Sequence, residues 1–273
     1  MKVLIKPNPT RQVSLEVSAR VAETLKKLGI EYIYYDETNL RNSNNIHHLI
    51  DDSDFVLAVG GDGSITRTAK LAAVHNKPIL GINAGNVAFM AGLEGNELSL
   101  LSKLIDGDYE IDSRMLLDVT VEEKDNVTKY SCLNDVVFAR GQDVRIIEAL
   151  VDCDGYRVGT YRADGVIFAT PTGSTAYSLS AGGPIVEPGL ECIMLSPICP
   201  YTISSRPIIF GCHSKLEISC TNYNKQTVFS CDGEPPIDFH TTARAYIQKS
   251  PYHAEFVRIK SEKFWDILIN KIH

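Results

Sequence analysis

The sequence predicts an α/β domain followed by a β-rich, sandwich-like domain. The first third of the chain alternates strand and helix patterns, which favours a Rossmann-like parallel sheet with helices on its faces. After about Asp106 many short strand-like runs follow with few helices, as is typical of a β-sandwich. The length of 273 residues agrees with roughly two domains at about 150 residues each. We expect the α/β domain to span 1–105, joined by 253–273, and the β-rich domain to span 106–252.

In the first third, short apolar runs predict a strand at Lys2–Lys6 and a doubly buried strand at Phe55–Val59. Between them, apolar residues spaced by three and four predict an amphipathic helix that Gly29 ends. The other predicted elements here are a strand at Glu31–Tyr35, a helix at Ile65–His75, a buried strand at Pro78–Ile82 and a helix at Glu97–Ile105.

The rest of the chain is predicted to be a series of strands. Asp154-Gly155 lies between two of them and is a hairpin turn signal. The tail at Phe264–Ile272 is again helix-like. The predicted strands are Met115–Val121, Lys129–Arg140, Arg145–Asp152, Tyr156–Tyr161, Val166–Ala169, Cys192–Leu195, Ile208–Phe210, Lys215–Ser219, Thr227–Cys231 and Ala243–Ile247.

Composition and charge exclude several classes of protein. A net charge of −7 leaves no basic excess to bind a nucleic-acid backbone, so nucleic acid is not an expected partner. The longest uncharged run, Gly165–Val186, contains four glycines and two prolines, which a lipid-facing helix disfavours, so no membrane association is expected. The seven cysteines include no C-x-x-C pair. We expect buried free thiols and a cytoplasmic location.

The sharpest local signal is the sequence Gly-Gly-Asp-Gly-Ser at Gly60–Ser64. It follows a buried strand and opens a helix, so its backbone N–H groups and the helix N-terminus favour an anion such as phosphate. It matches neither the G-x-G-x-x-G dinucleotide fingerprint nor the Walker loop. The alternative is a plain strand-to-helix turn with Asp62 or Ser64 as the helix N-cap. We interpret the segment as a phosphate loop that carries its own carboxylate.

Three further segments are candidate parts of a site. Gly81–Asn86 follows the next predicted strand, and consecutive parallel strands end at the same sheet edge. At Asp164–Pro184 a strand runs into a loop rich in glycine and small hydroxyl residues, which offers donors to sugar and phosphate oxygens. Leu133–Val137 carries the polar pair Asn134 and Asp135. Each segment alone is also compatible with an ordinary loop or strand, and no histidines have metal-binding spacing.

In this order, the motifs resemble those of the NAD kinase family, which phosphorylates the adenosine ribose of NAD to give NADP. The resemblance extends from about Phe55 to Glu234. Gly60–Ser64 is similar to the family's G-G-D-G signature, and Asp164–Tyr177 resembles its D-G-x-x-x-x-T-P-T-G-S-T-A-Y segment. Two more stretches that resemble the family are Gly81-Ile82-Asn83 with Gly85 and Phe89, and Pro197–Pro200 with Arg206-Pro207.

The resemblance implies a role for individual residues. Asp62 would be the base that takes the proton of the ribose 2′-hydroxyl. Arg67 would lie near phosphate, and Phe89 would line the adenine pocket. The residues that it implies in substrate binding are Gly61, Gly63, Arg67, Asn83, Phe89, Asn134, Asp135, Arg145, Arg162, Asp164, Thr172, Thr175, Ala176, Tyr177, Ser180 and Glu234.

The resemblance also implies the partners of the reaction. The substrates would be NAD and a phosphoryl donor, either ATP or polyphosphate, and the cofactor would be Mg²⁺ or another divalent cation. Because the sequence shows no dedicated carboxylate cage, we expect this cation to arrive with the donor. The assembly would be a homodimer or homotetramer, and the C-terminal helix would pack back on the first domain. The chain departs from the family's usual residues at Met90, Asp135, Tyr201 and Glu234, where Leu or Tyr, Glu, His and Gln are common.

Two other functions share parts of this pattern. Kinases of lipid or sphingoid alcohols carry a similar glycine-rich loop with an aspartate, but they are not expected to carry the Thr172–Tyr177 segment. A dinucleotide-binding sensor without catalysis would not need Asp62. Both motifs are present, so the sequence favours the phosphorylation of NAD over these alternatives.

Overall fold

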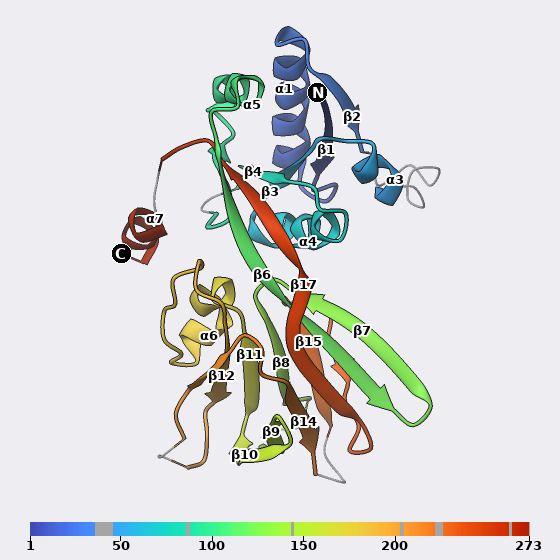
Figure 1. Cartoon of the computed structure of the whole chain (residues 1–273), viewed down its shortest axis with the longest axis vertical. Coiled ribbons are helices and arrows are strands. Elements are labelled where there is room, and N and C mark those ends of the chain that lie inside the picture. Colours follow the sequence, from blue (N-terminus) through green and yellow to red (C-terminus); the bar gives the residue numbers. More distant parts are fainter. Residues whose placement is uncertain are drawn as a thin grey trace. The chain divides into compact units, whose positions relative to one another are not determined.

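The computed structural model describes residues 1–35, 46–85, 88–142, 145–202, 205–221, 226–261 and 264–272. They form two compact units (Figure 1). Unit 1 contains Met1–Arg114 and Tyr252–His273, and unit 2 contains Met115–Pro251. The predicted fold class, α/β followed by a β-sandwich, is confirmed, and the C-terminal segment belongs to the α/β unit.

Unit 1 is built on a parallel sheet with the strand order β4-β3-β1-β2. Strand β2 lies on one side of β1, whereas β3 and β4 lie on the other, so the strand order switches direction between β1 and β3. In open α/β sheets, ligands bind at the carboxyl ends of the strands at such a switch point. On the other edge, β4 pairs with the short β5 and with Phe256 of β17. The bounds of these strands are β1 (Lys2–Pro7), β2 (Glu31–Tyr34), β3 (Phe55–Gly60), β4 (Ile79–Asn83), β5 (Leu93–Glu94) and β17 (Arg244–Arg258).

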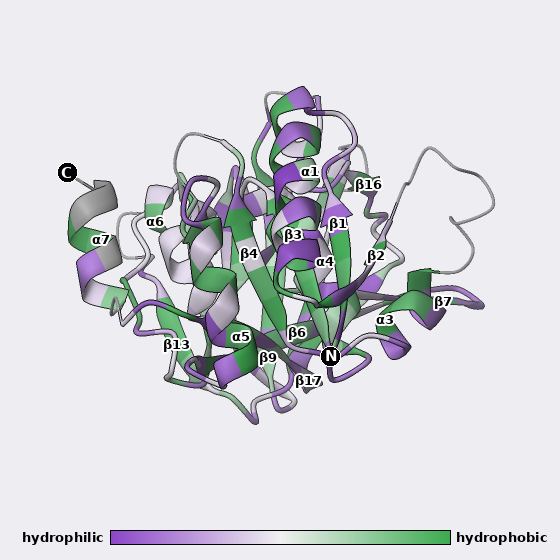
Figure 2. Ribbon diagram, turned by 90° about the horizontal axis from the view of Figure 1, so that it is seen from above, coloured by the Kyte–Doolittle hydropathy of each residue, from purple (hydrophilic) through white to green (hydrophobic). Residues whose placement is uncertain are grey.

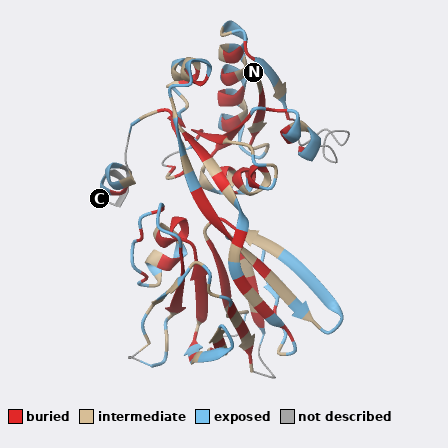
Figure 3. Ribbon diagram, in the orientation of Figure 1, coloured by how far each residue is buried: buried red, intermediate tan, exposed pale blue. Residues whose placement is uncertain are grey.

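The central strands are hydrophobic because helices cover the sheet. Figure 2 colours these strands by hydropathy, and every residue of β3 and β4 is buried (Figure 3), as predicted for strands that pack on both faces. Helix α1 (Gln12–Lys27) joins β1 to β2 and buries Val17, Val21 and Leu25. Helix α4 (Asp62–Ala73) joins β3 to β4 and buries Ile65 and Ala69.

The other helices of unit 1 are short. The predicted helix at Glu97–Ile105 is a 3₁₀ helix at Leu98–Ser102 that continues as α5 (Lys103–Asp106). Helix α3 (Ile46–Asp51) was not predicted, whereas α7 (Phe264–Ile272) matches its prediction. In the part of the chain that the structure describes, no helix has the length and apolar character needed to cross a membrane.

The core of unit 1 joins residues that lie far apart in the sequence. Val3, Leu57 and Leu80 of the sheet pack in one cluster with Val21 and Leu25 of α1. Two residues from the C-terminal segment, Val257 and Ile259, belong to the same cluster. The α/β unit therefore needs both ends of the chain.

Unit 2 is a sandwich of two largely antiparallel sheets. The first has the order β10-β9-β14-β17, and β6 lies between β17 and β7. The second has the order β13-β12-β11-β8-β15-β16. The bounds are β6 (Glu110–Glu123), β7 (Asn126–Cys132), β8 (Asp135–Arg140), β9 (Ile147–Cys153), β10 (Tyr156–Ala163), β11 (Gly165–Ala169), β12 (Cys192–Ile198), β13 (Ile208–Gly211), β14 (Leu216–Cys220), β15 (Thr227–Cys231) and β16 (Ile237–Asp238).

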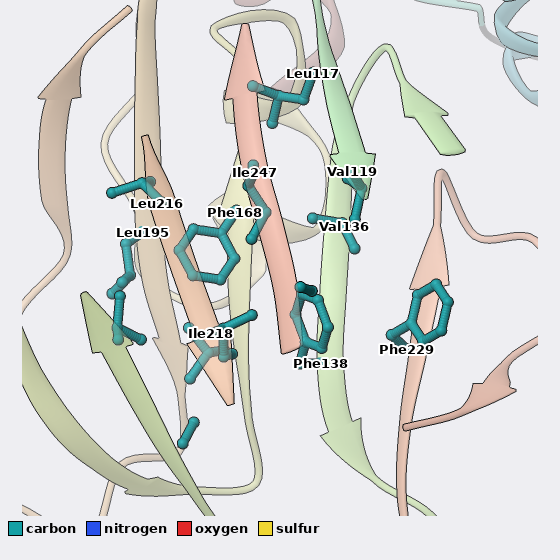
Figure 4. Close-up of a cluster of buried hydrophobic side chains, with 14 of the residues drawn as sticks. Leu117, Val119, Val136, Phe138, Phe168, Leu195, Leu216, Ile218, Phe229 and Ile247 are labelled. Atoms are coloured by element: carbon teal, nitrogen blue, oxygen red, sulfur yellow. The ribbon is translucent and has the colours of Figure 1, made fainter. Parts of the chain in front are cut away.

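The two sheets of unit 2 meet in a hydrophobic core (Figure 4). Ile218 and Ile247 come from the first sheet, and Phe138, Phe168 and Phe229 come from the second. The ring of Phe138 contacts that of Phe168 edge to face, with centroids 6.1 Å apart, and stacks on that of Phe229 at 5.8 Å. Such aromatic pairs stabilise a core beyond the area that they bury.

Two strand predictions need correction. The single strand expected at Lys129–Arg140 is two strands, β7 and β8, because the chain turns at Leu133-Asn134. The strand expected at Ala243–Ile247 is the start of β17, which continues through Pro251 to Arg258. All seven cysteines are free, but only four are buried, and Cys199 is exposed.

Candidate functional site

The glycine loop, Gly60–Ser64, connects β3 to α4 in unit 1. A Cβ on Gly60 would lie 2.8 Å from the Cβ of Ser64, so the loop requires glycine there. Gly61 is the N-cap of α4 and has extended backbone, with open space where its side chain would be. Gly63 is exposed at the start of the helix. The loop therefore leaves the first backbone N–H groups of α4 accessible to an anion.

Two backbone amides fix the carboxylate of Asp62, the first residue of α4. The N–H of Phe89 donates to Oδ2 at 3.0 Å, and the N–H of Met90 donates to Oδ1 at 2.9 Å. A carboxylate oxygen can accept more than one hydrogen bond. The two amides therefore fix the orientation of the group and leave each oxygen able to accept a further bond. The sequence did not reveal this contact, because the rest of α4, strand β4 and two loops separate Asp62 from Phe89.

The other predicted residues of unit 1 lie around this loop. Arg67 is exposed one turn further along α4, and its Nη1 lies 3.9 Å from where a Cβ on Gly63 would be. Asn83 is only 3% exposed. Its amide donates to Glu94 at 2.8 Å and accepts the N–H of Gly85 at 2.9 Å, so it shapes the loop after β4. Gly60 and Asn83 are register partners, and the two loops adjoin as predicted.

Unit 2 contains a pocket of about 380 Å³. Four of the residues that line it were predicted from the sequence, namely Asn134, Asp135, Ala176 and Tyr177. Four were not named as site residues, namely Val137, Ser230, Asp232 and Gly233, although Val137 lies in the candidate segment Leu133–Val137.

Asp232 holds the backbone around Asn134, which lines this pocket. Its carboxylate accepts the backbone N–H groups of Leu133, Asn134 and Asp135 at 2.9, 2.7 and 3.2 Å. In return, the N–H of Asp232 donates to the carbonyl of Asp135 at 2.9 Å. Asp232 has a left-handed backbone, with φ of 50°, before Gly233. This Asp-Gly turn after a strand was the signal that could have marked the residue.

Asp135 presents a second carboxyl group to the same pocket and is only 4% exposed. Burial and, second, the neighbouring charge of Asp232 raise the pKa of Asp135 to about 7. A hydrogen bond from the N–H of Tyr177 acts in the opposite direction. The pocket therefore contains a carboxyl group that changes its charge near neutral pH.

The hydroxyl-rich segment folds as the 3₁₀ helix Thr172–Thr175 and α6 (Tyr177–Ser180), and the two residues where they meet, Ala176 and Tyr177, line the pocket. A Cβ on Gly173 would lie 2.1 Å from the carbonyl oxygen of Asn134, so only glycine permits this close approach. The Thr170 hydroxyl donates to the carbonyl of Leu133 at 2.6 Å and accepts the N–H of Gly173 at 3.1 Å. These contacts hold the segment against Asn134.

The remaining predicted residues of unit 2 are not among those that line the pocket. Asp164 is paired with Arg140 at 3.1 Å, and Arg162 lies over the ring of Tyr201 at 5.3 Å. Arg145, Ser180 and Glu234 are exposed, Thr172 is buried, and Thr175 is half-buried.

Comparison with known proteins covers nearly the whole chain. The family model for the ATP-NAD kinase N-terminal domain matches residues 3–109, and the model for the ATP-NAD kinase C-terminal domain matches residues 133–259. An NAD kinase from Caldanaerobacter subterraneus subsp. tengcongensis is 37% identical, over 99% of this chain and 98% of its own. An NAD kinase from Symbiobacterium thermophilum is 38% identical, over 80% of this chain and 78% of its own.

Two solved structures have the same fold. A yeast NADH kinase in complex with NADH has a TM-score of 0.88 and 25% identity, and the alignment covers 100% of this chain and 87% of the yeast chain. An NAD kinase from Archaeoglobus fulgidus in complex with ATP has a TM-score of 0.77 and 28% identity, with coverages of 99% and 97%.

Proposed function

The chain belongs to the NAD kinase family and has that family's phosphotransferase activity, and we propose how its residues carry out the reaction. The products are NADP and, with ATP as donor, ADP. The observation that carries the proposal is the fixed carboxylate of Asp62 within the glycine loop. It supplies a base beside backbone amides suited to phosphate.

We propose that the pocket of unit 2 binds the dinucleotide. Asn134 and Asp135 offer amide and carboxyl groups inside a concave, partly apolar pocket, and Tyr177 adds a half-exposed aromatic ring. The hydrogen bonds of Asp232 and the close approach at Gly173 keep these groups in place. Arg145, Arg162, Asp164, Ser180 and Glu234 are proposed to contact parts of the substrate that extend beyond the pocket.

Phosphoryl transfer requires positioning and charge neutralisation more than covalent chemistry. The oxygen of the ribose 2′-hydroxyl forms a bond to the γ-phosphorus of ATP while the bond from that phosphorus to the β-γ bridging oxygen breaks. Asp62 orients the hydroxyl and accepts its proton as the new bond forms, since a carboxylate is too weak a base to remove it beforehand. The electron pair of the broken bond leaves on ADP.

Magnesium belongs to the substrate in this scheme. Among the described residues, no group of three or more His, Cys, Asp or Glu side chains is arranged to hold a metal ion. Mg²⁺ usually binds proteins through one or two carboxylates together with substrate phosphates. The donor's phosphates would therefore hold the ion, and it would neutralise part of their charge.

The direct test is to incubate the protein with NAD, ATP and Mg²⁺ and to measure NADP with an NADP-specific dehydrogenase. The proposal predicts NADP formation, whereas diacylglycerol or sphingosine in place of NAD remains unphosphorylated. A lipid kinase would give the reverse result. A dinucleotide sensor would bind NAD and give no NADP, and either result would overturn the proposal.

We also propose that ATP, or another polyphosphate donor, is used in the cytoplasm by a homodimer or homotetramer. Seven free thiols suit a reducing compartment. Turnover with ATP, other nucleoside triphosphates and inorganic polyphosphate ranks the donors, and light scattering on the eluted peak of a sizing column gives the oligomeric state.

A further inference from the structure

The glycine loop brings a negative charge to the place where the donor is proposed to bind. Gly60–Ser64 contains the carboxylate of Asp62 and neither Lys nor Arg. A Walker loop, by comparison, carries a lysine that reaches the phosphates of its nucleotide. A triphosphate beside Asp62 therefore needs positive side chains from elsewhere on the same edge of the sheet.

A cavity of about 420 Å³, which we call the loop cavity, lies on this edge in unit 1. Arg11, Gln12 and Val13 line it from the segment after β1, and Ala84 and Gly85 line it from the segment after β4. Strand β3 lies between β1 and β4 in the sheet. The two walls of the cavity therefore flank the end of β3, where the glycine loop begins.

Hydrogen bonds connect the segments after β1 and β4, which carry the two walls, to the glycine loop and the end of β3. The side chain of Asn8 donates to the hydroxyl of Ser64 at 2.8 Å, and its backbone N–H donates to the carbonyl of Val59 at 3.0 Å. On the other side, the N–H of Ala84 donates to the carbonyl of Gly60 at 3.2 Å. The loop cavity and the glycine loop are therefore neighbours in unit 1, and hydrogen bonds fix their backbones relative to each other.

Arg11 is the basic residue of the loop cavity. Its Nη1 lies 3.7 Å from where a Cβ on Gly85 would be, so the guanidinium extends across the cavity toward the opposite wall. Among the described residues, no carboxylate lies within ion-pair distance of Arg11, and the first turn of α1 contains no acidic residue. The guanidinium is thus available to an anion from outside the chain.

Arg11 also occupies a position where another residue would serve the helix better. It is the N-cap of α1 and makes no capping hydrogen bond with its side chain, whereas Ser, Asp, Asn and Thr are the favoured N-caps. Departures from local preference are expected where a residue serves function instead of stability.

We infer that Arg11 binds the phosphates of the phosphoryl donor, which lie in the loop cavity above the end of β3. The inference rests on the proposed function and adds to it a residue that supplies the positive charge missing from the glycine loop. Arg suits this task because its guanidinium forms two parallel hydrogen bonds to phosphate oxygens. Arg11 is a binding residue for the donor and takes no part in binding NAD.

The test compares Arg11→Ser, Arg11→Lys and the matched control Arg20→Ser, which removes the same charge from an exposed site on the same helix. We expect Arg11→Ser to raise the KM for ATP on the order of 10- to 100-fold, the range for a charge-assisted hydrogen bond, while the KM for NAD changes by less than about twofold. Arg11→Lys keeps the positive charge but lacks the two parallel N–H donors of the guanidinium, so it should give an intermediate KM for ATP. Arg20→Ser behaves as wild type.

Stability measurements separate this role from a structural one. Because serine is a favoured N-cap, Arg11→Ser should unfold at the same temperature as wild type or higher, although its affinity for the donor falls. Calorimetric binding of Mg²⁺-ATP and of inorganic tripolyphosphate, without NAD, should weaken to a similar extent in Arg11→Ser.

An unchanged KM for ATP in Arg11→Ser, an equal loss in Arg20→Ser, or full retention of tripolyphosphate binding would overturn the inference. These outcomes leave the proposed function intact as long as wild type converts NAD to NADP. If wild type makes no NADP, the proposed function fails, and the donor-binding measurements still decide whether Arg11 binds phosphate.

Discussion

At the scale of single residues, Asp135 is a carboxylic acid whose surroundings disfavour its charged form. Its carboxyl group is buried and faces the charge of Asp232, and its pKa rises to about 7. The same group in an unfolded chain has a pKa of about 3.9, so between these values the folded protein holds a proton that the unfolded chain has lost. The free energy of unfolding should therefore fall as the pH rises from about 4 to about 7.

Asp135→Asn tests this dependence. Asparagine stays neutral at every pH and its carbonyl oxygen can still accept the N–H of Tyr177, so the variant should lose less stability than wild type between about pH 5 and about pH 8. Urea unfolding at several pH values measures the difference. Parallel pH profiles for the two proteins would show that Asp135 does not titrate in this range.

At the scale of elements, the approach of the Thr172–Thr175 helix to Asn134 determines the shape of the pocket. Gly173→Ala places a methyl group 2.1 Å from the carbonyl oxygen of Asn134, and overpacking of this kind costs about 1–3 kcal/mol or more. We expect a lower unfolding temperature and weaker NAD binding by calorimetry. The matched control is Gly189→Ala, because no atom lies within 4 Å of its added Cβ. Equal behaviour of the two variants would contradict this account of the pocket.

The elements that the sequence predicted well are those whose signal is local. The apolar run of β3 and the spacing of Val17, Val21 and Leu25 in α1 each specify burial by their own pattern. The glycine loop was found for the same reason, because glycines between a strand and a helix mark a close backbone approach within a few residues.

The elements that the sequence predicted poorly depend on distant partners. The sequence pattern of β7 and β8 predicts one strand. In the structure the two strands are separate, and the break lies where the carboxylate of Asp232 accepts the N–H groups of Leu133 and Asn134. β17 continues past Pro251, a residue that argues locally for the end of a strand. Asp232 was missed as part of the pocket because its partners lie about 100 residues earlier in the chain.

At the scale of the whole molecule, unit 1 depends on the segment that follows unit 2. Val257 and Ile259 are buried in its core, and Phe256 pairs with Ile79 at the edge of the sheet. A chain that ends at Pro251 should therefore lose the fold of unit 1 and keep that of unit 2. A chain that ends at Ser261 lacks only residues 262–273, which include α7, and it serves as the control.

Hydrogen exchange followed by mass spectrometry distinguishes the two units. In the chain that ends at Pro251, peptides from β3 should exchange rapidly while peptides from β8 stay protected. Protection of β3 equal to that in the full chain would show that unit 1 folds without the segment.

In the proposed reaction, Asp62 serves the chemical step of phosphoryl transfer to NAD. The most direct measurement is the single-turnover rate of NADP formation by Asp62→Asn, with saturating NAD and Mg²⁺-ATP, beside the control Asp106→Asn on the exposed surface of α5. We expect a rate about 10²–10⁴-fold below wild type, the range for general acid–base help, with NAD affinity nearly unchanged and the control fully active. A rate for Asp62→Asn close to that of wild type would contradict it.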